Sequence, residues 1–336
     1  MSELHSGQPP VLSSGERPVG VRDTRPVPGE HGVLDAKTFD AIEADQLFDS
    51  FNHAVTHVGQ VVLYRSLARP AADPANVRKK QEALRELESN PALRERLERY
   101  MEEMRRGEQS LYDLLYGNFN GGIAIENSRR SSDKMEFSGY GYNQFLDGTG
   151  FVIDLVELAQ TLPQPRSEYL RELFDAIGEF GHSRIYSLMR GPIYPVDGKF
   201  KTSEEKPRYT PVFRFRPSML KPLPILLVLG GLSLALYFFQ GMLASFGISY
   251  LGFGILVLAV PVLPVLLIAI AASDRDNIIY PLRKLFKHSV ELARVMETLG
   301  RIDEMMSFYR YAQTFGGPMV LPEIMDSDCH SLDASA

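Results

Sequence analysis

Cysteine is almost absent from this chain of 336 residues, which contains only Cys329. A single thiol excludes an internal disulfide and a zinc site built from cysteines. An excess of positive charge is missing too, because 36 lysines and arginines stand against 42 aspartates and glutamates, for a net charge of -6. Proteins dedicated to nucleic-acid binding normally present a basic surface. The composition therefore argues against that class, although it permits a local basic patch.

The first 30 residues have no apolar run of the kind found in a secretory signal peptide. They are rich in proline, glycine, serine and charged residues. Segments of this composition bury too little apolar surface to fold on their own. We therefore expect a disordered tail over residues 1–30.

Charge is absent from two long stretches, Leu223 to Phe239 and Ile248 to Ala272. Crossing a bilayer takes about 20 apolar residues, and both stretches reach that length once their flanks are counted. The connection between them, QGMLASFG, is short and uncharged. We expect a two-helix transmembrane hairpin over 219–273, with spans at about 219–241 and 248–272. A buried hairpin in a soluble protein is the alternative, but two successive charge-free runs are rare in soluble cores.

Both flanks of this hairpin are rich in lysine and arginine, a feature of cytoplasmic segments. We therefore expect an integral protein of the inner or plasma membrane with both soluble flanks in the cytoplasm. Neither run contains an ionisable residue, which favours an anchor over a transporter. Several cations, near the hairpin or in an earlier loop, are candidates for contact with phosphate or lipid head groups: Arg129, Arg130, Lys134, Arg208, Arg214, Arg216 and Lys221.

The remaining sequence is helical by pattern, and the fold class that we expect is mainly α. Thr56 is placed to cap a helix that ends before Pro70, and Asp73-Pro74 and Asn90-Pro91 have the form of further helix starts. A glycine-rich irregular segment should follow at 117–150, then helices at 151–162 and 167–190 and a basic connector at 191–218. A single long helix should run from Pro281 to about Phe315.

The expected organisation has four consecutive parts. They are a disordered tail (1–30), a cytoplasmic helical region (31–218), the transmembrane hairpin (219–273), and a return helix with the C-terminal tail (274–336). The return helix should pack against the helices of 55–105, so that the hairpin interrupts one helical bundle in sequence.

The stretch AVTHVGQVVLYRSLARPAADPANVRKKQEALREL, residues 54–87, resembles the core, or lever, domain of the MutS family of DNA mismatch-repair proteins. The matching positions are Val55, Thr56, Gly59, Leu63, Leu67, Pro70, Asp73, Arg78 and Gln81. Arg78 and Gln81 enclose two lysines, which departs from the closer Arg-Gln pair often seen in the family. Residues 34–42 look like the family's strand-and-turn lead-in, and 308–324, with Pro322, look like its helix end and following strand.

This resemblance implies a MutS-core-like helical bundle, with the hairpin where MutS proteins insert a clamp, as in the membrane-associated MutS-related proteins. It also implies ATP-dependent binding of mismatched DNA. However, the chain has no Gly-x-x-x-x-Gly-Lys-Ser/Thr loop to hold ATP phosphates, and no Phe-x-Glu wedge to read a mismatch. We therefore expect no catalytic activity, no cofactor and no metal.

The function that we expect is a membrane-tethered lever or scaffold. Its partners would be membrane lipid, a protein (an ATPase or a second copy of the chain) and, weakly, DNA. The alternatives are a DNA-binding module of a repair complex, whose ATPase is supplied by a partner or lost by truncation, and a small transporter. Three further side-chain groups are better explained as structural or solvated residues than as metal or hydrolase sites: His53 with His57, Asp175 with His182 and Ser183, and Asp326 with Asp328, Cys329 and His330.

Overall fold

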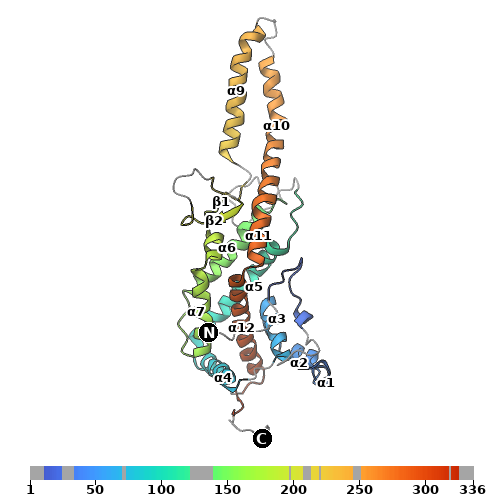
Figure 1. Ribbon diagram of the computed structural model, residues 1–336. Helices are drawn as coiled ribbons and strands as arrows, with labels where there is room; N and C mark the ends of the chain where they lie inside the picture. Colours follow the sequence, from blue (N-terminus) through green and yellow to red (C-terminus); the bar gives the residue numbers. More distant parts are fainter. Residues whose placement is uncertain are drawn as a thin grey trace. The chain divides into compact units, whose positions relative to one another are not determined.

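The computed structural model is mainly helical, which confirms the fold class at this level (Figure 1). It describes residues 11–24, 34–69, 73–121, 139–196, 198–206, 213–218, 221–244, 251–317 and 319–324. The chain divides into two compact units. Unit 1 comprises Met1–Tyr112, Gly150–Arg190 and Phe286–Ala336, and unit 2 comprises Asp113–Thr149 and Gly191–Leu285. This division differs from the four consecutive parts expected from the sequence, because each unit is assembled from separate segments.

Unit 1 begins with a 3-10 helix, η2 (Val21–Thr24), and three α-helices, α1 (Ala36–Ala41), α2 (Ala44–Phe51) and α3 (His57–Ala68). The prediction of a disordered tail is wrong for residues 11–24, because Val11 and Leu12 are buried and Arg22 forms an ion pair with Asp49 at 2.8 Å. The strand-and-turn lead-in expected at 34–42 is also wrong, because the Asp35 carboxylate caps α1 instead.

Helices α4 (Pro74–Ser89) and α5 (Pro91–Tyr116) begin where the sequence predicts. The Asp73 carboxylate accepts from the Ala75 amide, and proline stands at the first helical position of α4. The Asn90 side chain accepts from the Leu93 amide at 3.2 Å. The apolar stripe of α5 is fully buried, as its helical spacing indicates: Leu93, Leu97, Tyr100, Met101 and Met104.

Helix α6 (Tyr142–Ala159) contradicts the irregular segment expected over 117–150, because it begins eight residues before that segment was to end. Its two internal glycines, Gly148 and Gly150, disfavour a helix by propensity, but tertiary packing overrides propensity. The buried side chains of Phe151, Val152 and Leu155 supply that packing in unit 1. Helices α7 (Glu168–Gly181) and α8 (Arg184–Arg190) follow, within the range predicted as helical.

The single long helix expected from Pro281 is wrong. A π-helix, η3 (Arg275–Ile279), leads into α11 (Tyr280–Lys287), and a separate helix, α12 (Val290–Gln313), follows. The break occurs because the Ser289 hydroxyl caps α12, accepting from the Leu292 amide at 3.0 Å. Helix α12 packs on α2, α3, α4 and α7 and forms the centre of unit 1.

Unit 2 contains two short strands, β1 (Tyr194–Val196) and β2 (Lys199–Lys201), in the segment expected to be a plain connector. It also contains helices α9 (Pro222–Ala244) and α10 (Leu251–Asp274), which contact each other and lie side by side (Figure 1). Helix α9 begins three residues later than the predicted span, and the described part of α10 begins at Leu251.

Within the residues that the structure describes, no helix meets the length and apolarity required to cross a membrane. Residues 245–250 and the side chains of 251–262 belong to the predicted hairpin but lie outside that description. The transmembrane hairpin therefore stays a prediction.

Candidate functional site

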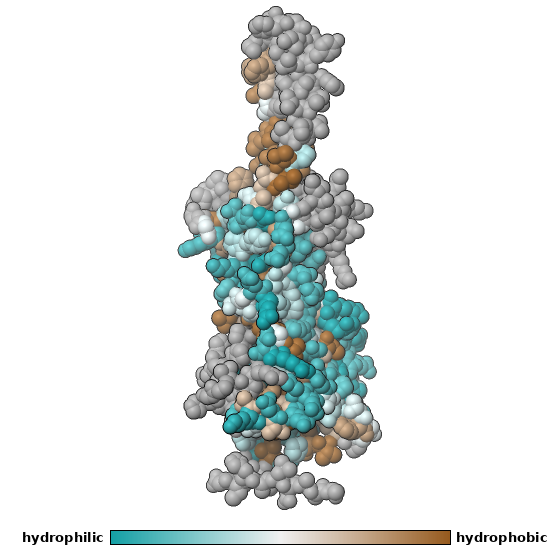
Figure 2. All heavy atoms as spheres, turned by 90° about the vertical axis from the view of Figure 1, so that its right-hand side faces the viewer, coloured by the Kyte–Doolittle hydropathy of each residue, from teal (hydrophilic) through white to brown (hydrophobic). Residues whose placement is uncertain are grey.

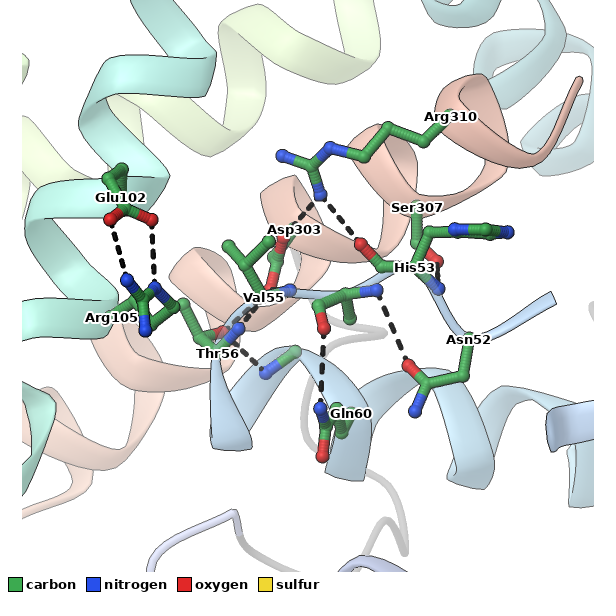
Figure 3. A network of polar contacts seen from close by, with 12 residues as sticks. Asn52, His53, Val55, Thr56, Gln60, Glu102, Arg105, Asp303, Ser307 and Arg310 are labelled. Atoms are coloured by element: carbon green, nitrogen blue, oxygen red, sulfur yellow. Dashed lines mark hydrogen bonds and ion pairs between the residues drawn. The ribbon is translucent and has the colours of Figure 1, made fainter. Parts of the chain in front are cut away.

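The candidate site lies in unit 1, where α12 crosses the start of α3 (Figure 3). At its centre is the carboxylate of Asp303, which is fully buried. Its Oδ2 atom accepts hydrogen bonds from the Val55 amide at 2.9 Å, from the Thr56 amide at 2.8 Å and from the Thr56 hydroxyl at 2.8 Å. The Thr56 hydroxyl in turn accepts from the Gly59 amide at 2.9 Å. We call these five residues, Val55, Thr56, Gly59, Asp303 and the adjoining Arg310, the Asp303 node.

A second buried carboxylate, Glu108 of α5, completes the cap of α3. Its two oxygens accept from the His57 amide at 2.8 Å and the Val58 amide at 2.9 Å, and the Tyr112 hydroxyl donates to it at 3.0 Å. The first amides of a helix lack partners inside the helix and carry a partial positive charge. Two carboxylates from distant helices therefore bind the same helix end.

Burial dominates the electrostatics of both carboxylates. Burial raises the pKa of Asp303 above its ordinary value, although the Thr56 donors and the Arg310 guanidinium oppose the rise. Burial likewise raises the pKa of Glu108, against the amides of Val58 and His57 and the Tyr112 hydroxyl. The donors around each carboxylate leave its oxygens occupied, so the geometry suits a structural joint better than a proton-transfer site.

The segment before α3 is also bound to α12. The Arg310 guanidinium donates to the His53 carbonyl at 2.8 Å and to Asp303 at 3.3 Å. The Ser307 hydroxyl accepts from the His53 amide at 2.9 Å (Figure 3). It also donates to the Phe51 carbonyl at 3.1 Å. The segment that precedes α3 is therefore hydrogen-bonded along more than one turn of α12.

Close contact between α3 and α12 depends on two glycines. A Cβ atom at Gly59 would lie 2.3 Å from the Asp303 carboxylate, and one at Gly300 would lie 2.6 Å from the Val62 side chain. Both distances are far shorter than a van der Waals contact. The hydrogen bonds of the Asp303 node can form only because these positions have no side chain.

A buried ionic network extends from this crossing to α4 and α7. Glu297 of α12 pairs with Arg65 of α3 and, at 3.0 Å, with Arg301. Glu304 pairs with Lys80 of α4 at 3.2 Å. Burial lowers the pKa of Lys80, but the Glu304 carboxylate outweighs burial and the pKa lies above its ordinary value. Such pairs add little net stability but penalise any arrangement that separates them.

Tyr169 of α7 lies beside this network, with the Lys80 ammonium 5.8 Å from its ring centre. Burial raises the pKa of its hydroxyl. The Tyr169 hydroxyl and the Glu304 Oε1 atom are both buried, and neither has a hydrogen-bond partner among the described residues. The sequence carried no signal for this cluster, because α7 and α12 lie far along the chain from α3 and α4.

The residues that carry the family resemblance meet in the structure. The Gln81 side chain donates to the Pro322 carbonyl at 2.8 Å, and Arg78 donates to the Ile324 carbonyl at 3.2 Å. Leu63 is fully buried in a cluster with Phe39, Phe48, Phe51 and Tyr64, and Leu67 packs against that cluster. Asp73 caps α4, whereas Pro70 lies outside the described residues.

The predicted phosphate or lipid contacts have different surroundings. Arg214 and Arg216 are exposed on either side of the buried Phe215. Lys221 forms an ion pair with Asp274 and lies over the Phe215 ring at 5.3 Å, so it is held by an internal contact instead of being free for a head group. The other four cations lie outside the described residues: Arg129, Arg130, Lys134 and Arg208.

Among the described residues, no group of three or more His, Cys, Asp or Glu side chains could hold a metal ion. The Nε2 atom of His57 donates a hydrogen bond to the Val19 carbonyl at 2.8 Å. The Ser183 hydroxyl accepts from the Tyr186 amide at 3.1 Å, which makes it a helix cap. The cluster around Cys329 lies outside the described residues.

No family model, curated protein or solved structure matches this chain.

Proposed function

We propose that the chain is a membrane-anchored helical lever or scaffold, related to the core domain of the MutS family, with both soluble flanks in the cytoplasm. The observation that carries the lever part is the convergence of the two stretches that resemble the family. Residues 54–87 and 308–324 are joined by the Gln81–Pro322 and Arg78–Ile324 hydrogen bonds. Contact between these two stretches, which are distant in sequence, supports the interpretation that both belong to one MutS-core-like unit.

The internal construction of unit 1 suits a part that transmits force. Two buried carboxylates hold the start of α3, and the ionic network joins α3, α4 and α12. Buried charged pairs resist sliding, because an unpaired charge in the interior is costly. These helices should therefore move together as one body.

The anchoring part rests on the apolar surface of α9 and α10. The chain has no charged residue from Pro222 to Ser273. Large apolar side chains of α9 are exposed, among them Leu226 at 64% and Leu227 at 68%, and Figure 2 shows hydrophobic surface in this part of the molecule. An apolar surface of this extent marks a membrane or protein contact. The proposal uses the whole sequence of both helices, including the side chains that the structure does not describe.

Membrane fractionation of the full chain tests the anchor. The wild type should stay with membranes through an alkaline carbonate wash. The variant Leu226→Glu/Leu227→Glu/Leu234→Glu should be released, because each charge at the centre of a membrane helix costs about 3 kcal/mol. The matched control, Ile42→Glu/Val290→Glu/Val320→Glu, changes exposed apolar side chains of unit 1 and should stay with membranes. Release of the wild type would refute anchoring.

A pull-down from detergent-solubilised membranes tests the scaffold. We expect a stoichiometric protein partner, either an ATPase or a second copy of the chain. A chain recovered alone as a monomer would argue against a scaffold. Tight, salt-sensitive DNA binding in a gel shift with the full chain would instead favour the DNA-binding alternative, because phosphate contacts release counterions.

A further inference from the structure

Unit 2 contains a small antiparallel sheet that precedes α9 in the chain. In it, Tyr194 of β1 lies opposite Lys201 of β2, and Val196 lies opposite Lys199. An isolated bridge joins Ile193 to Phe215. Directly opposite residues of an antiparallel pair project from the same face, and successive residues project from opposite faces.

This alternation gives the sheet one apolar and one cationic face. Ile193 and Phe215 are 3% and 5% exposed, and the Phe215 ring packs edge-on against Phe145 at 5.7 Å. The neighbours of these buried residues, Tyr194, Arg214 and Arg216, must therefore point to the opposite side.

Three lysines lie on that opposite side with the two arginines. Lys199 and Lys201 share it with Tyr194 by register, and the Lys206 ammonium lies over the Tyr194 ring at 5.1 Å. We call this set the cationic face: Lys199, Lys201, Lys206, Arg214 and Arg216. In the described part of the chain, none of the five forms an ion pair, whereas nearby Lys221 is paired with Asp274.

The local charge balance is positive in a chain that is acidic overall. From 191 to 221 the sequence contains seven lysines and arginines against three acidic residues. One of these acids, Glu205, is engaged by the Thr202 amide at 3.1 Å. Cations that form no ion pair with the described residues favour an anionic partner, and attraction to that partner weakens with added salt.

The position in the chain selects the kind of anion. Only four residues lie between Arg216 and Lys221, and the charge-free helix α9 begins at Pro222. If α9 enters a bilayer as proposed above, the cationic face lies close to the membrane surface, where anionic phospholipids display their phosphates. Tyr194 adds an aromatic side chain of the kind enriched at that interface.

We propose that the cationic face binds the phosphate groups of anionic phospholipids in the membrane that the α9–α10 hairpin enters. This inference rests on the proposed anchoring, and it identifies which lipids the anchor prefers. It does not require Lys221, whose charge is matched by Asp274.

The test uses the full chain purified from mixed micelles of phosphatidylglycerol and phosphatidylcholine, with the retained lipids counted by mass spectrometry. The wild type should retain phosphatidylglycerol several-fold in excess, and added salt should reduce the excess. The variant Lys199→Gln/Arg214→Gln/Arg216→Gln should lose the preference. The control Lys37→Gln/Arg85→Gln/Arg96→Gln removes the same charge from exposed positions of unit 1 and should keep it.

Carbonate washing of the same variants separates this inference from the proposed function. If the wild type stays in membranes but shows no preference for phosphatidylglycerol, the cationic face is refuted and anchoring is not. The same holds if both variants lose the preference equally. Release of the wild type would refute anchoring. Flotation with phosphatidylglycerol vesicles would then test the cationic face separately. Binding by the wild type but not by Lys199→Gln/Arg214→Gln/Arg216→Gln would support it. Nucleic acid retained in place of lipid would overturn the assignment.

Discussion

Two glycines, Gly59 and Gly300, determine how closely α3 and α12 approach. Each faces the opposite helix at a distance that leaves no room for a methyl group. The approach brings the Thr56 hydroxyl and two backbone amides within reach of Asp303. The absence of two side chains thus allows a buried carboxylate to cap a helix 247 residues away.

Gly59→Ala and Gly300→Ala should each lower the free energy of unfolding by about 1–3 kcal/mol, because an added methyl group overpacks the crossing. The control is Gly178→Ala in α7, where nothing lies within 4 Å of the added atom. That change should raise stability by roughly 0.5–1 kcal/mol, the usual gain over glycine inside a helix. Chemical denaturation of the three variants measures both effects, and a loss of equal size in all three would contradict the close approach.

Asp303→Ala should destabilise unit 1 by about 3–5 kcal/mol, because it leaves the Arg310 charge and two buried amides without their partner. Hydrogen exchange at the Val55 and Thr56 amides should accelerate in this variant. Asp35→Ala removes an exposed cap of α1 and should have a much smaller effect on stability. If the two variants lose similar stability, Asp303 contributes only as an ordinary helix cap.

At the scale of the elements, helix starts fall into two groups. Those of α3, α4 and α5 carry their caps in the adjacent sequence, at Thr56, Asp73 and Asn90, and were predicted from it. The start of α7 does not, because the Ser167 side chain makes no cap hydrogen bond. Glu86 of α4 binds the amides of Arg166 at 2.6 Å and Ser167 at 2.7 Å instead.

Glu86→Gln should weaken the fold at neutral pH and have little effect in acid. Burial acts to raise the pKa of Glu86, but the Arg166 and Ser167 donors outweigh it and hold the pKa below the ordinary 4.5. A carboxylate whose pKa is lower in the folded chain stabilises the fold above that ordinary value, and the contribution is lost as the pH falls through the folded-state pKa.

Denaturation of the wild type and Glu86→Gln at a series of pH values measures this difference. The gap between them should shrink steadily below pH 4.5, the ordinary value for glutamate. Glu82→Gln, an exposed change on the same helix, is the control. The same pH dependence in both variants would show that the cap of α7 is not responsible.

The elements that sequence reasoning missed share a physical cause. Residues 11–24 and the start of α6 are ordered by contacts with distant segments, such as Arg22 with Asp49 and Tyr142 with Asp274. The break between α11 and α12 depends on one serine, Ser289, within a stretch whose pattern predicts a single long helix. At the candidate site, Thr56 and Gly59 were recognised, but Asp303 and Glu108 were not, because nothing local marks an acid as the cap of a remote helix.

On the scale of the whole molecule, unit 1 depends on its last segment. Helix α12 contributes a continuous set of buried side chains to the core: Leu292, Val295, Met296, Leu299, Ile302, Met305 and Met306. Without them, the apolar sides of α3, α4 and α7 would face water. The segment that closes the core is therefore synthesised after α3, α4 and α7, the helices that it covers.

Ending the chain after Leu285 should abolish cooperative unfolding of unit 1, whereas ending it after Phe315 should preserve it. The second truncation retains α12 and removes residues 316–336, including the 319–324 stretch with its Arg78 and Gln81 contacts. Circular dichroism during denaturation and resistance to protease compare the two. Cooperative unfolding of the shorter chain would mean that α12 is dispensable to the core.

The backbone passes between the two units four times, at residues 112, 149, 190 and 285. A cut between α9 and α10 would therefore leave each fragment holding part of unit 1, with α3 in one and α12 in the other. The close contact between those two helices provides a complementary surface through which the two fragments can associate. We therefore expect two polypeptides, divided between α9 and α10 and produced together, to reassemble unit 1.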